Sequence, residues 1–356
     1  TYGRQNWFEY SAEECRATRE AVAMFDQSSF GKFVLEGEDA EAIINNVSAN
    51  DMSVPVGKLV YTQWLNERGG IEADLTVTRE AANKYMVVTA AATQVRDFQW
   101  LKDHIPAGAK ATLTDVTSGM AVLSIMGPNS RALLQSLTHT DMSNEAFPFG
   151  TSQIIDLGYA RVRASRVTFV GELGWELYIA TEYATGVFDA IVAAGAPFGL
   201  KHAGYHALNS LRMEKGYRHW SHDISPDDTP IEAGLGFTVA YDKPGGFIGR
   251  EALLKQKETG VKKRLVQFAL NDASKLLYHN EPIWRNGEIV GHIASGMFGH
   301  HIGKSIGMGY VENHHGLADK AFITEGSYEI EVAGERVTAV AQLEPFYDPK
   351  SARVKA

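Results

Sequence analysis

The sequence is poor in several features that mark common classes of protein. Its 356 residues include one cysteine, Cys15, which excludes an internal disulfide and a multi-cysteine metal site and fits a reducing compartment. No run of about 18 or more residues is apolar, so we expect no membrane span. Positive charge is not in excess, and a formal net charge of −9 argues against a general nucleic-acid binder. The chain begins at Thr1 without a recognisable signal segment, which fits a processed chain or an excerpt.

The motifs of several enzyme classes are missing as well. The glycines of "YDKPGGFIGREAL" fit neither the P-loop nor the dinucleotide fingerprint, which favours a turn leading into a helix over 250–257. No Gly-x-Ser-x-Gly elbow occurs, and we place Cys15 on the polar side of a helix without a nearby histidine in the sequence. The pairs His300-His301 and His314-His315 match no zinc pattern, and neighbours on a strand point to opposite faces. We therefore predict no metal site.

What is present alternates between strand and helix periods over the first 260 residues. Ser11 and Glu14 have capping-box spacing ahead of Ala17, Ala21 and Phe25, which repeat at helical spacing. The segments "KFVLEG", "LTVTRE", "KYMVVTA", "MAVLSIMG" and "WELYIA" are typical of strands, and helices are expected near 40–47, 93–104, 184–194 and 203–215. This alternation predicts an α+β fold with split βαβ units.

From about Arg264 the pattern changes. Short strands such as "RLVQFAL", "EIVGHIASG", "IGMGYV" and "YEIEVAGERVTAVAQL" are separated by Gly and Asn turns, with almost no helical period. This predicts a C-terminal β-barrel or sandwich, with the boundary near the polar run 255–263.

Two acidic segments are candidates for chemistry. In "FVGELGWELYIA", strand alternation puts Glu176 and Tyr178 on the face opposite Trp175, and a carboxylate there can accept parallel hydrogen bonds from an amino-heterocycle such as a pterin or purine. In "LNERGGIEADLTV", Glu72 and Asp74 share a face and could form an acid/base pair, with Tyr61 as an aromatic wall on the other hairpin arm. Spacing alone leaves a solvated strand edge or a plain hairpin as the alternative for each.

Several stretches together resemble the aminomethyltransferase family, which includes the glycine cleavage T-protein and the folate-binding halves of dimethylglycine and sarcosine dehydrogenases. They are "LNERGGIEADLTV", "TFVGELGWELYI", "SLRMEKGYRHWSHDISPDDTPIEAGLGF", "FIGREAL", "GHHIGKSIGMGYV" and "EPFYDP". The resemblance covers nearly the whole chain and is greatest to the dehydrogenase branch. It implies a three-lobed fold, with two ferredoxin-like α+β lobes and a Greek-key β-barrel around tetrahydrofolate. We divide the chain into a folate-binding region, 1–260, in which about 45–118 form one lobe, and a barrel domain, 261–356.

The resemblance implies a role for five residues. Asp74 matches the aspartate that faces the reactive folate nitrogens, so we predict that it is catalytic. Glu176 matches the glutamate that grips the amino-pyrimidine edge of the pterin. Tyr61 matches an aromatic residue of the folate site, Phe169 matches a tyrosine and lacks its hydroxyl, and Tyr347 of "EPFYDP" completes the predicted folate-binding set.

The sequence also departs from the family's patterns. Leu208 stands where the T-protein has an arginine that touches folate, and Glu72 falls outside the shared pattern, which reduces the acid/base pair to Asp74. Gly246 replaces the cysteine that marks related iron–sulfur assembly factors, which argues against a non-catalytic module of that type.

The resemblance implies tetrahydrofolate-dependent capture of the one-carbon unit of an iminium, derived from an N-methyl amine, to give 5,10-methylenetetrahydrofolate. Alternatives are methyl transfer giving 5-methyltetrahydrofolate and a non-catalytic folate-binding module. FAD is expected only on a further flavoprotein domain or subunit. We expect neither a nucleic-acid nor a membrane partner, and a location in a bacterial cytoplasm or, for a eukaryotic protein, in the mitochondrial matrix.

Overall fold

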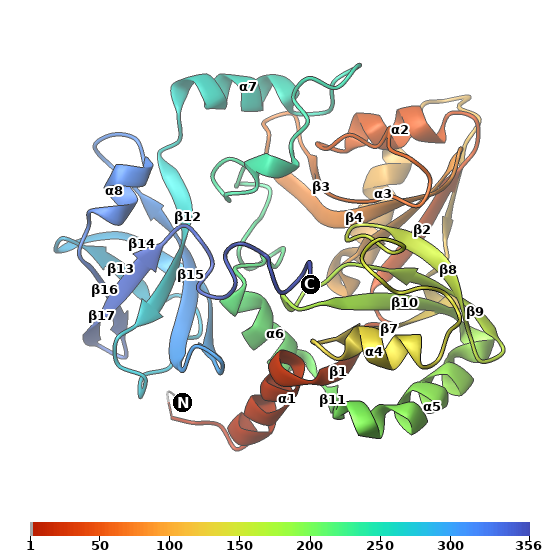
Figure 1. Ribbon diagram of the computed structural model, residues 1–356. Helices are drawn as coiled ribbons and strands as arrows, with labels where there is room; N and C mark the ends of the chain where they lie inside the picture. The colour runs from red at the N-terminus through yellow and green to blue at the C-terminus, as the bar shows by residue number, and fades with distance from the viewer. Residues whose placement is uncertain (1–2) are drawn as a thin grey trace.

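A computed structural model describes residues 3–356 and contains two open β-sheets and one closed barrel (Figure 1). In Figure 1 the barrel lies on one side of the molecule and the two sheets lie on the other. This arrangement confirms the predicted α+β fold with a C-terminal barrel. No helix within residues 3–356 is long and apolar enough to cross a membrane.

The first sheet carries the hairpin that contains Asp74. Its strands, in spatial order, are β3 (Leu59–Leu65), β4 (Ile71–Ala81), β5 (Lys84–Thr89), β2 (Gly31–Glu36) and β6 (Thr112–Asp115). The helices α2 (Ala40–Val47) and α3 (Gln94–Asp103), the latter preceded by η1 (Ala91–Thr93), pack on one face of the sheet. Since side chains alternate along a strand, Ala73, Leu75 and Val77 enter this core. Asp74 consequently points to the other face.

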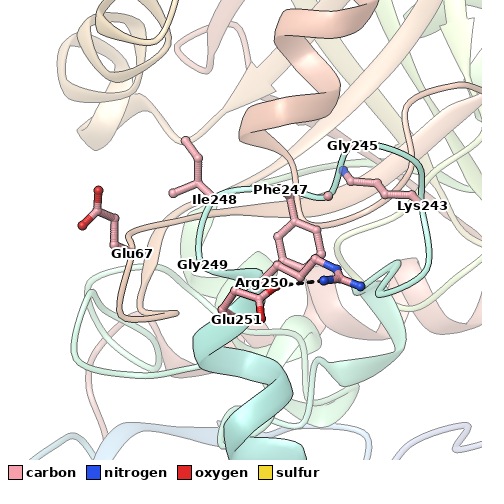
Figure 2. A pocket seen from close by; sticks show the side chains of 9 residues that line it. Glu67, Lys243, Gly245, Phe247, Ile248, Gly249, Arg250 and Glu251 are labelled. Atoms are coloured by element: carbon pink, nitrogen blue, oxygen red, sulfur yellow. Dashed lines mark hydrogen bonds and ion pairs between the residues drawn. The ribbon is translucent and has the colours of Figure 1, made fainter.

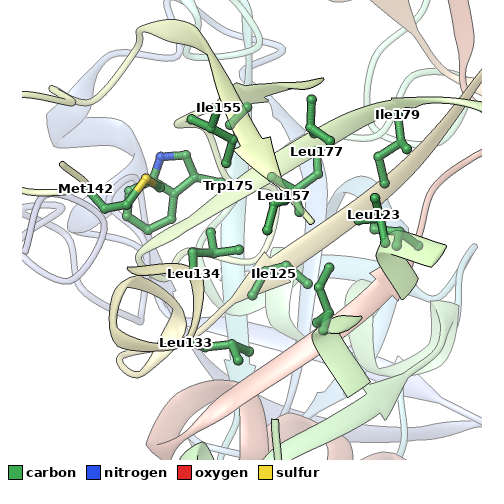
Figure 3. Close-up of a cluster of buried hydrophobic side chains, with 14 of the residues drawn as sticks. Leu123, Ile125, Leu133, Leu134, Met142, Ile155, Leu157, Trp175, Leu177 and Ile179 are labelled. Carbon is green, nitrogen blue, oxygen red and sulfur yellow. The ribbon is translucent and has the colours of Figure 1, made fainter. Parts of the chain in front are cut away.

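The second sheet carries Glu176 on an interior strand. The spatial order of its strands is β11 (Leu200–Ala203), β1 (Val22–Asp26), β7 (Met120–Met126), β10 (Gly174–Ala180), β9 (Ala160–Ser165) and β8 (Ser152–Leu157). Two helices, α4 (Ser130–Gln135) and α5 (Ala184–Gly195), cover one face over the core shown in Figure 3. Three short 3-10 turns accompany these elements: η2 (Thr117–Gly119), η3 (Thr181–Tyr183) and η4 (Ala196–Phe198).

The free faces of the two sheets meet. Trp175, Leu177 and Ile179 of β10 enter the core of Figure 3, so Glu176 and Tyr178 point to the opposite face, as strand alternation predicted. There Tyr178 and Val122 pack against Met86 and Val88 of β5 in the first sheet. Val88 pairs with Thr76, two residues after Asp74. Asp74 and Glu176 therefore lie on the two faces that form the interface between the sheets.

The barrel is closed by six strands, in the order β12 (Lys263–Leu270), β15 (Lys304–Glu312), β14 (Glu288–Gly299), β13 (Pro282–Arg285), β16 (Tyr328–Val332) and β17 (Glu335–Gln342). Sequence reasoning missed β13 and α8 (Lys320–Thr324), because elements of four and five residues are too short to show a period. A side-chain cap defines α8: the Asp319 carboxylate accepts the Phe322 N–H at 2.8 Å. The domain limits set at 260/261 stay a prediction.

Two helices and a long connection join the barrel to the sheets. α1 (Phe8–Glu20) and α6 (Tyr205–Glu214) pack on the second sheet, and Met213 at the end of α6 enters a cluster with the barrel residues Ile306 and Met308. The chain then runs through η5 (Gly236–Thr238) and α7 (Arg250–Thr259) before it reaches the barrel.

The reading of the first helix was wrong in three respects. α1 begins after Trp7 without a side-chain cap, so Ser11 lies inside the helix and no capping box forms. The helix ends at Glu20, and Phe25 belongs to strand β1. Cys15 is buried rather than on a polar side, and its thiol donates to the Ala207 carbonyl at 3.7 Å. The four-residue spacing of Ala17, Ala21 and Phe25 continues across the junction between the helix and β1, which is why the pattern overran the helix.

Candidate functional site

Asp74 is presented by the β3–β4 hairpin. The connecting turn uses Gly69, whose φ of +82° favours glycine, and the predicted hairpin is confirmed. The strand register puts Asp74 directly opposite Gln63, and the Gln63 side-chain amide donates to Asp74 Oδ1 at 2.8 Å. Asp74 is half-buried, and one of its carboxylate oxygens is held by the side chain of Gln63.

The surroundings of Asp74 oppose its charge. Burial raises the pKa of its carboxyl from 3.8 to about 6, and hydrogen bonds from Gln63 and Tyr61 and the positive charge of Arg218 offset part of that rise. The carboxylate of Asp97, on α3, adds a small further increase. A carboxyl group with a pKa near 6 is ionised at neutral pH and still accepts a proton readily, which suits a general base.

The aromatic side chain of Tyr61 lies beside this carboxylate. Tyr61 packs with Trp220 and Tyr241 against an apolar cluster that includes Leu65 and Phe247. Burial and the neighbouring Asp74 raise the pKa of the Tyr61 hydroxyl well above its usual value, so it stays protonated. Flat apolar walls beside a carboxylate fit an aromatic heterocycle.

Glu176 is a buried carboxylate on the facing sheet. It is 8% exposed, and Glu176 Oε2 accepts the Tyr178 hydroxyl at 2.5 Å. Within residues 3–356 it forms no ion pair, and burial raises its pKa. A carboxylate on an interior strand, with one oxygen engaged by a neutral hydroxyl, can bind the amino and ring N–H groups of a heterocycle. The alternative of a solvated strand edge is wrong for this residue.

Phe169 packs beside the second sheet and pairs with another aromatic ring. Its ring stacks on Tyr217 with centroids 6.1 Å apart and an interplanar angle of 17°. It packs at the margin of the cluster formed by α1, α6 and the second sheet, next to Val170 and Leu208. Leu208 is buried in that cluster, so the position that an arginine occupies in the T-protein is filled here by apolar packing.

Tyr347 has a different setting. Its hydroxyl donates to Glu172 Oε1, the Arg19 guanidinium lies 3.9 Å over its ring, and His301 packs edge-on at 4.9 Å. Glu172 also binds Arg19 and Arg353, at 3.3 Å each. Tyr347 thereby attaches the C-terminal segment to α1 and the second sheet, and the folate-binding role predicted for it stays a prediction.

Glu72 does not join Asp74 in an acid/base pair. Its Oε2 forms an ion pair with Arg96, and its Oε1 accepts from the Asn66 side chain at 2.9 Å. Arg96 in turn lies 4.6 Å over the ring of Trp220, whose indole N–H donates to the Ile71 carbonyl. Glu72 therefore holds the hairpin turn in place through Asn66 and the Trp220 ring in place through Arg96.

Sequence reasoning missed three residues around the site: Gln63, Tyr217 and Arg218. The turn "NERGG" alone would pair Gln63 with Ala73, and a β-bulge between Trp64 and Leu65 shifts the register so that Gln63 lies opposite Asp74. Tyr217 and Arg218 follow α6 in "KGYRHW", and Arg218 donates to the Gly216 and Ala233 carbonyls. No local pattern marked them, because a chain reversal after α6 brings them to the sheets.

A cavity next to α7 contains none of the predicted site residues. It measures about 640 Å³ and is formed by the turn before α7 together with Glu67 and Lys243 (Figure 2). Gly249, with φ of +86°, ends the turn, so the predicted turn into a helix is confirmed, and Gly246 lines the cavity at the position of the missing cysteine. Within residues 3–356 no group of three or more His, Cys, Asp or Glu side chains is arranged to hold a metal ion.

The sequence and the fold match known proteins. The GCVT N-terminal domain matches residues 1–243, and the glycine cleavage T-protein C-terminal barrel domain matches residues 263–348. The glycine cleavage system aminomethyltransferase T from Bartonella henselae has the same fold, with a TM-score of 0.83 at 24% identity over 95% of this chain and 90% of that one.

Three curated relatives are similar to this chain over most of its length. The 4-methylaminobutanoate oxidase (formaldehyde-forming) of Paenarthrobacter nicotinovorans is 42% identical over 100% of this chain and 42% of its own length. Mitochondrial sarcosine dehydrogenase of Homo sapiens is 42% identical over 96% of this chain and 39% of its length. An aminomethyltransferase of Caldanaerobacter subterraneus is 34% identical over 86% of this chain and 81% of its length.

The chain thus spans about two fifths of the length of the two relatives named for amine oxidation and most of the aminomethyltransferase. Both parts of the T-protein are matched in order along the chain. The chain belongs to the aminomethyltransferase family of the glycine cleavage T-protein and is related to N-demethylating oxidoreductases.

Proposed function

We propose that this chain binds tetrahydrofolate and transfers to it the one-carbon unit of an iminium derived from an N-methyl amine, giving 5,10-methylenetetrahydrofolate. The observation that carries the proposal is Asp74, a half-buried carboxylate with a pKa raised to about 6, on the face where the two sheets meet. Family membership supplies the cofactor, since aminomethyltransferases use tetrahydrofolate.

The residues present fit a bound tetrahydrofolate. Glu176 is buried, is not paired with a cation within the described chain, and has one oxygen engaged by Tyr178, so its remaining acceptor sites suit the amino-pyrimidine edge. Tyr61 and Phe169 provide aromatic surface for the pterin and the ring that follows it. We retain Tyr347 in the proposed binding set through its position beside Glu172.

Bound tetrahydrofolate supplies two amine nitrogens that can share one carbon. Transfer of the carbon would form two C–N bonds to folate nitrogens and break the C–N bond to the donor amine. The folate nitrogens lose two protons, of which the departing amine would take one and Asp74 would accept the other. Its negative charge also favours the cationic carbon before capture. Holding donor and acceptor together makes capture effectively unimolecular and reduces hydrolysis of the iminium to formaldehyde.

The source of the iminium lies outside the chain. The relatives named as 4-methylaminobutanoate oxidase and sarcosine dehydrogenase are more than twice as long as this chain. We therefore propose that a flavoprotein domain or subunit oxidises the N-methyl amine, with FAD bound there, and that this chain receives the product.

Calorimetry with tetrahydrofolate under anaerobic conditions tests binding. We expect Glu176→Ala to weaken binding about 10- to 100-fold, the loss expected for a hydrogen-bonded buried charge. Glu182→Ala, an exposed glutamate of the same lobe, serves as the matched control. Equal affinity of the Glu176→Ala variant would remove Glu176 from the site, and absence of binding by the parent chain would refute the proposal.

Product analysis tests the reaction. The chain is incubated with tetrahydrofolate and sarcosine, with and without a flavin-dependent amine dehydrogenase, and the folate products are separated by mass. We expect 5,10-methylenetetrahydrofolate at the expense of free formaldehyde. Formation of 5-methyltetrahydrofolate would favour methyl transfer instead, and binding without any product would favour a non-catalytic module.

A further inference from the structure

We propose that Gln63 is a positioning residue that holds Oδ1 of Asp74 and so fixes which oxygen faces the reaction, an inference that rests on the proposed function of Asp74. Gln63 touches no reacting atom in this scheme. It acts through the carboxylate that its side chain contacts.

The first support is the placement of the Gln63 side chain. Gln63 is 0% exposed and lies directly across the β3–β4 pair from Asp74, with Gln63 Nε2 at 2.8 Å from Asp74 Oδ1. A fully buried amide must find partners for its polar atoms, and an apolar residue of similar size would fill the same space without that demand. The presence of an amide at this buried position is therefore explained by its hydrogen bond to the Asp74 carboxylate and not by packing alone.

The second support is a residue that orients the amide from another part of the chain. Thr238 Oγ1, 1% exposed, donates to Gln63 Oε1, and the same oxygen lies 2.7 Å from the Leu235 carbonyl. With its oxygen engaged by Thr238, the Gln63 amide presents its N–H group to Asp74. Thr238 belongs to η5, so the connection between sheets and barrel sets the direction of a hydrogen bond inside the hairpin.

Other groups around Asp74 do not perform this task. Tyr61, from β3, also hydrogen-bonds to Asp74, while Arg218 and Asp97 act on it through their charges from the connection after α6 and from α3. Glu72, on the same strand, is taken up by Arg96. Gln63 is thus the buried neutral donor to Asp74 Oδ1, and its hydrogen bond favours the ionised form that a base requires.

Direct titration of Asp74 tests the inference. The chain is labelled with ¹³C at the aspartate side-chain carboxyl carbons, and Asp74→Asn identifies the Asp74 signal. In Gln63→Leu we expect the titration midpoint of Asp74 to rise by about 0.5–1 pH unit, since a donor to the charged form is lost. Thr238→Val should shift it in the same direction by less.

Activity and binding give the second readout. We expect the acid limb of the transfer rate in Gln63→Leu to move to higher pH with the titration, while affinity for 5-formyltetrahydrofolate at pH 8 stays within about twofold. Gln99→Leu is the matched control, because Gln99 also donates to an aspartate, Asp103, at 2.5 Å, but on an exposed turn of α3. It should leave both the Asp74 titration and the pH profile unchanged.

The outcomes separate the two proposals. An unshifted Asp74 titration in Gln63→Leu overturns the positioning role, whatever the turnover. A shifted Asp74 titration in Gln63→Leu supports the role of Gln63 even if the parent chain never transfers carbon, and that lack of transfer refutes the proposed function. If Gln63→Leu does not fold, Gln63→Glu places a second carboxyl against Asp74, and two coupled titrations with one raised midpoint are then expected. A single unshifted titration in that variant also overturns the role.

Discussion

At the scale of single residues, the site depends on a carboxylate held where its charge is disfavoured. Burial raises the pKa of Asp74 to about 6, and the donors Gln63 and Tyr61 prevent a larger rise. The group therefore combines a stable ionised form at neutral pH with a readiness to accept a proton. Burial of an ionised carboxylate lowers the stability of the folded state, and functional sites commonly retain such unfavourable groups.

The pH dependence of transfer follows from this pKa. Because the ionised form of Asp74 is the base, we expect the transfer rate to fall tenfold for each pH unit below about 6. Asp74→Asn should still bind tetrahydrofolate but transfer carbon about 100-fold or more slowly, without the acid limb. Stopped-flow rates from pH 5 to 8 measure both effects, and normal turnover of Asp74→Asn would exclude Asp74 from the mechanism.

Stability should change in the opposite direction. The folded-state pKa of Asp74 lies above its usual 3.8, so the folded state binds a proton more tightly and stability falls as pH rises from about 4 to 6. At neutral pH the uncharged Asp74→Asn should therefore be more stable by about 1–3 kcal/mol. Urea unfolding at pH 7.5 and pH 4 tests this, because the advantage should shrink at the lower pH.

At the scale of elements, the β3–β4 turn is where the hairpin meets the connection to the barrel. A Cβ at Gly70 would lie 1.9 Å from the Pro226 carbonyl oxygen, and Asn66 caps the turn by accepting the Gly70 N–H at 3.0 Å. The glycine pair of "NERGG" thus serves two needs: Gly69 adopts a positive φ, and Gly70 permits close contact with the chain after α6.

Gly70→Ala should push the β3–β4 turn away from the chain that follows α6. We expect a loss of about 1–3 kcal/mol in the free energy of unfolding, because backbone on both sides must move to admit one methyl group. Gly119→Ala is the matched control, since Gly119 has an ordinary φ and no atom within 4 Å of the added Cβ. Equal stability of the two variants would show that the turn can shift to admit the methyl group at no cost in the free energy of unfolding.

Elements with a strong period were predictable, and contacts between distant elements were not. The alternation of "WELYIA" placed Glu176 and Tyr178 on one face, and the structure confirms it. Cys15 was misplaced, because its helix is covered by α6, a segment about 190 residues later in the chain. The pair of Gln63 and Thr238 is likewise created by tertiary contact, which no local pattern encodes.

At the scale of the whole molecule, buried charges connect the sheets to the barrel. Glu214, at the end of α6, accepts from Arg19 of α1 at 2.7 Å through Oε2. Through Oε1 it accepts the backbone N–H groups of His301 and Ile302, at 2.8 and 3.3 Å, in the turn between β14 and β15. One carboxylate thus joins the N-terminal helix, α6 and the barrel, and it fixes how the barrel lies against the two sheets.

Removal of this carboxylate should loosen the barrel more than it damages any single core. In Glu214→Ala the Arg19 guanidinium and two backbone donors lose a buried partner, and we expect a loss of about 3–5 kcal/mol in the free energy of unfolding. Limited proteolysis should then cut the connection 215–262 faster than in the parent chain. Glu38→Ala, which breaks the pair with Lys110 at side-chain exposures of 72% and 71%, is the control and should change stability by less than about 1 kcal/mol. Equal cleavage of the two variants would mean that apolar contacts such as Met213 with Ile306, rather than the buried charges, hold the barrel in place.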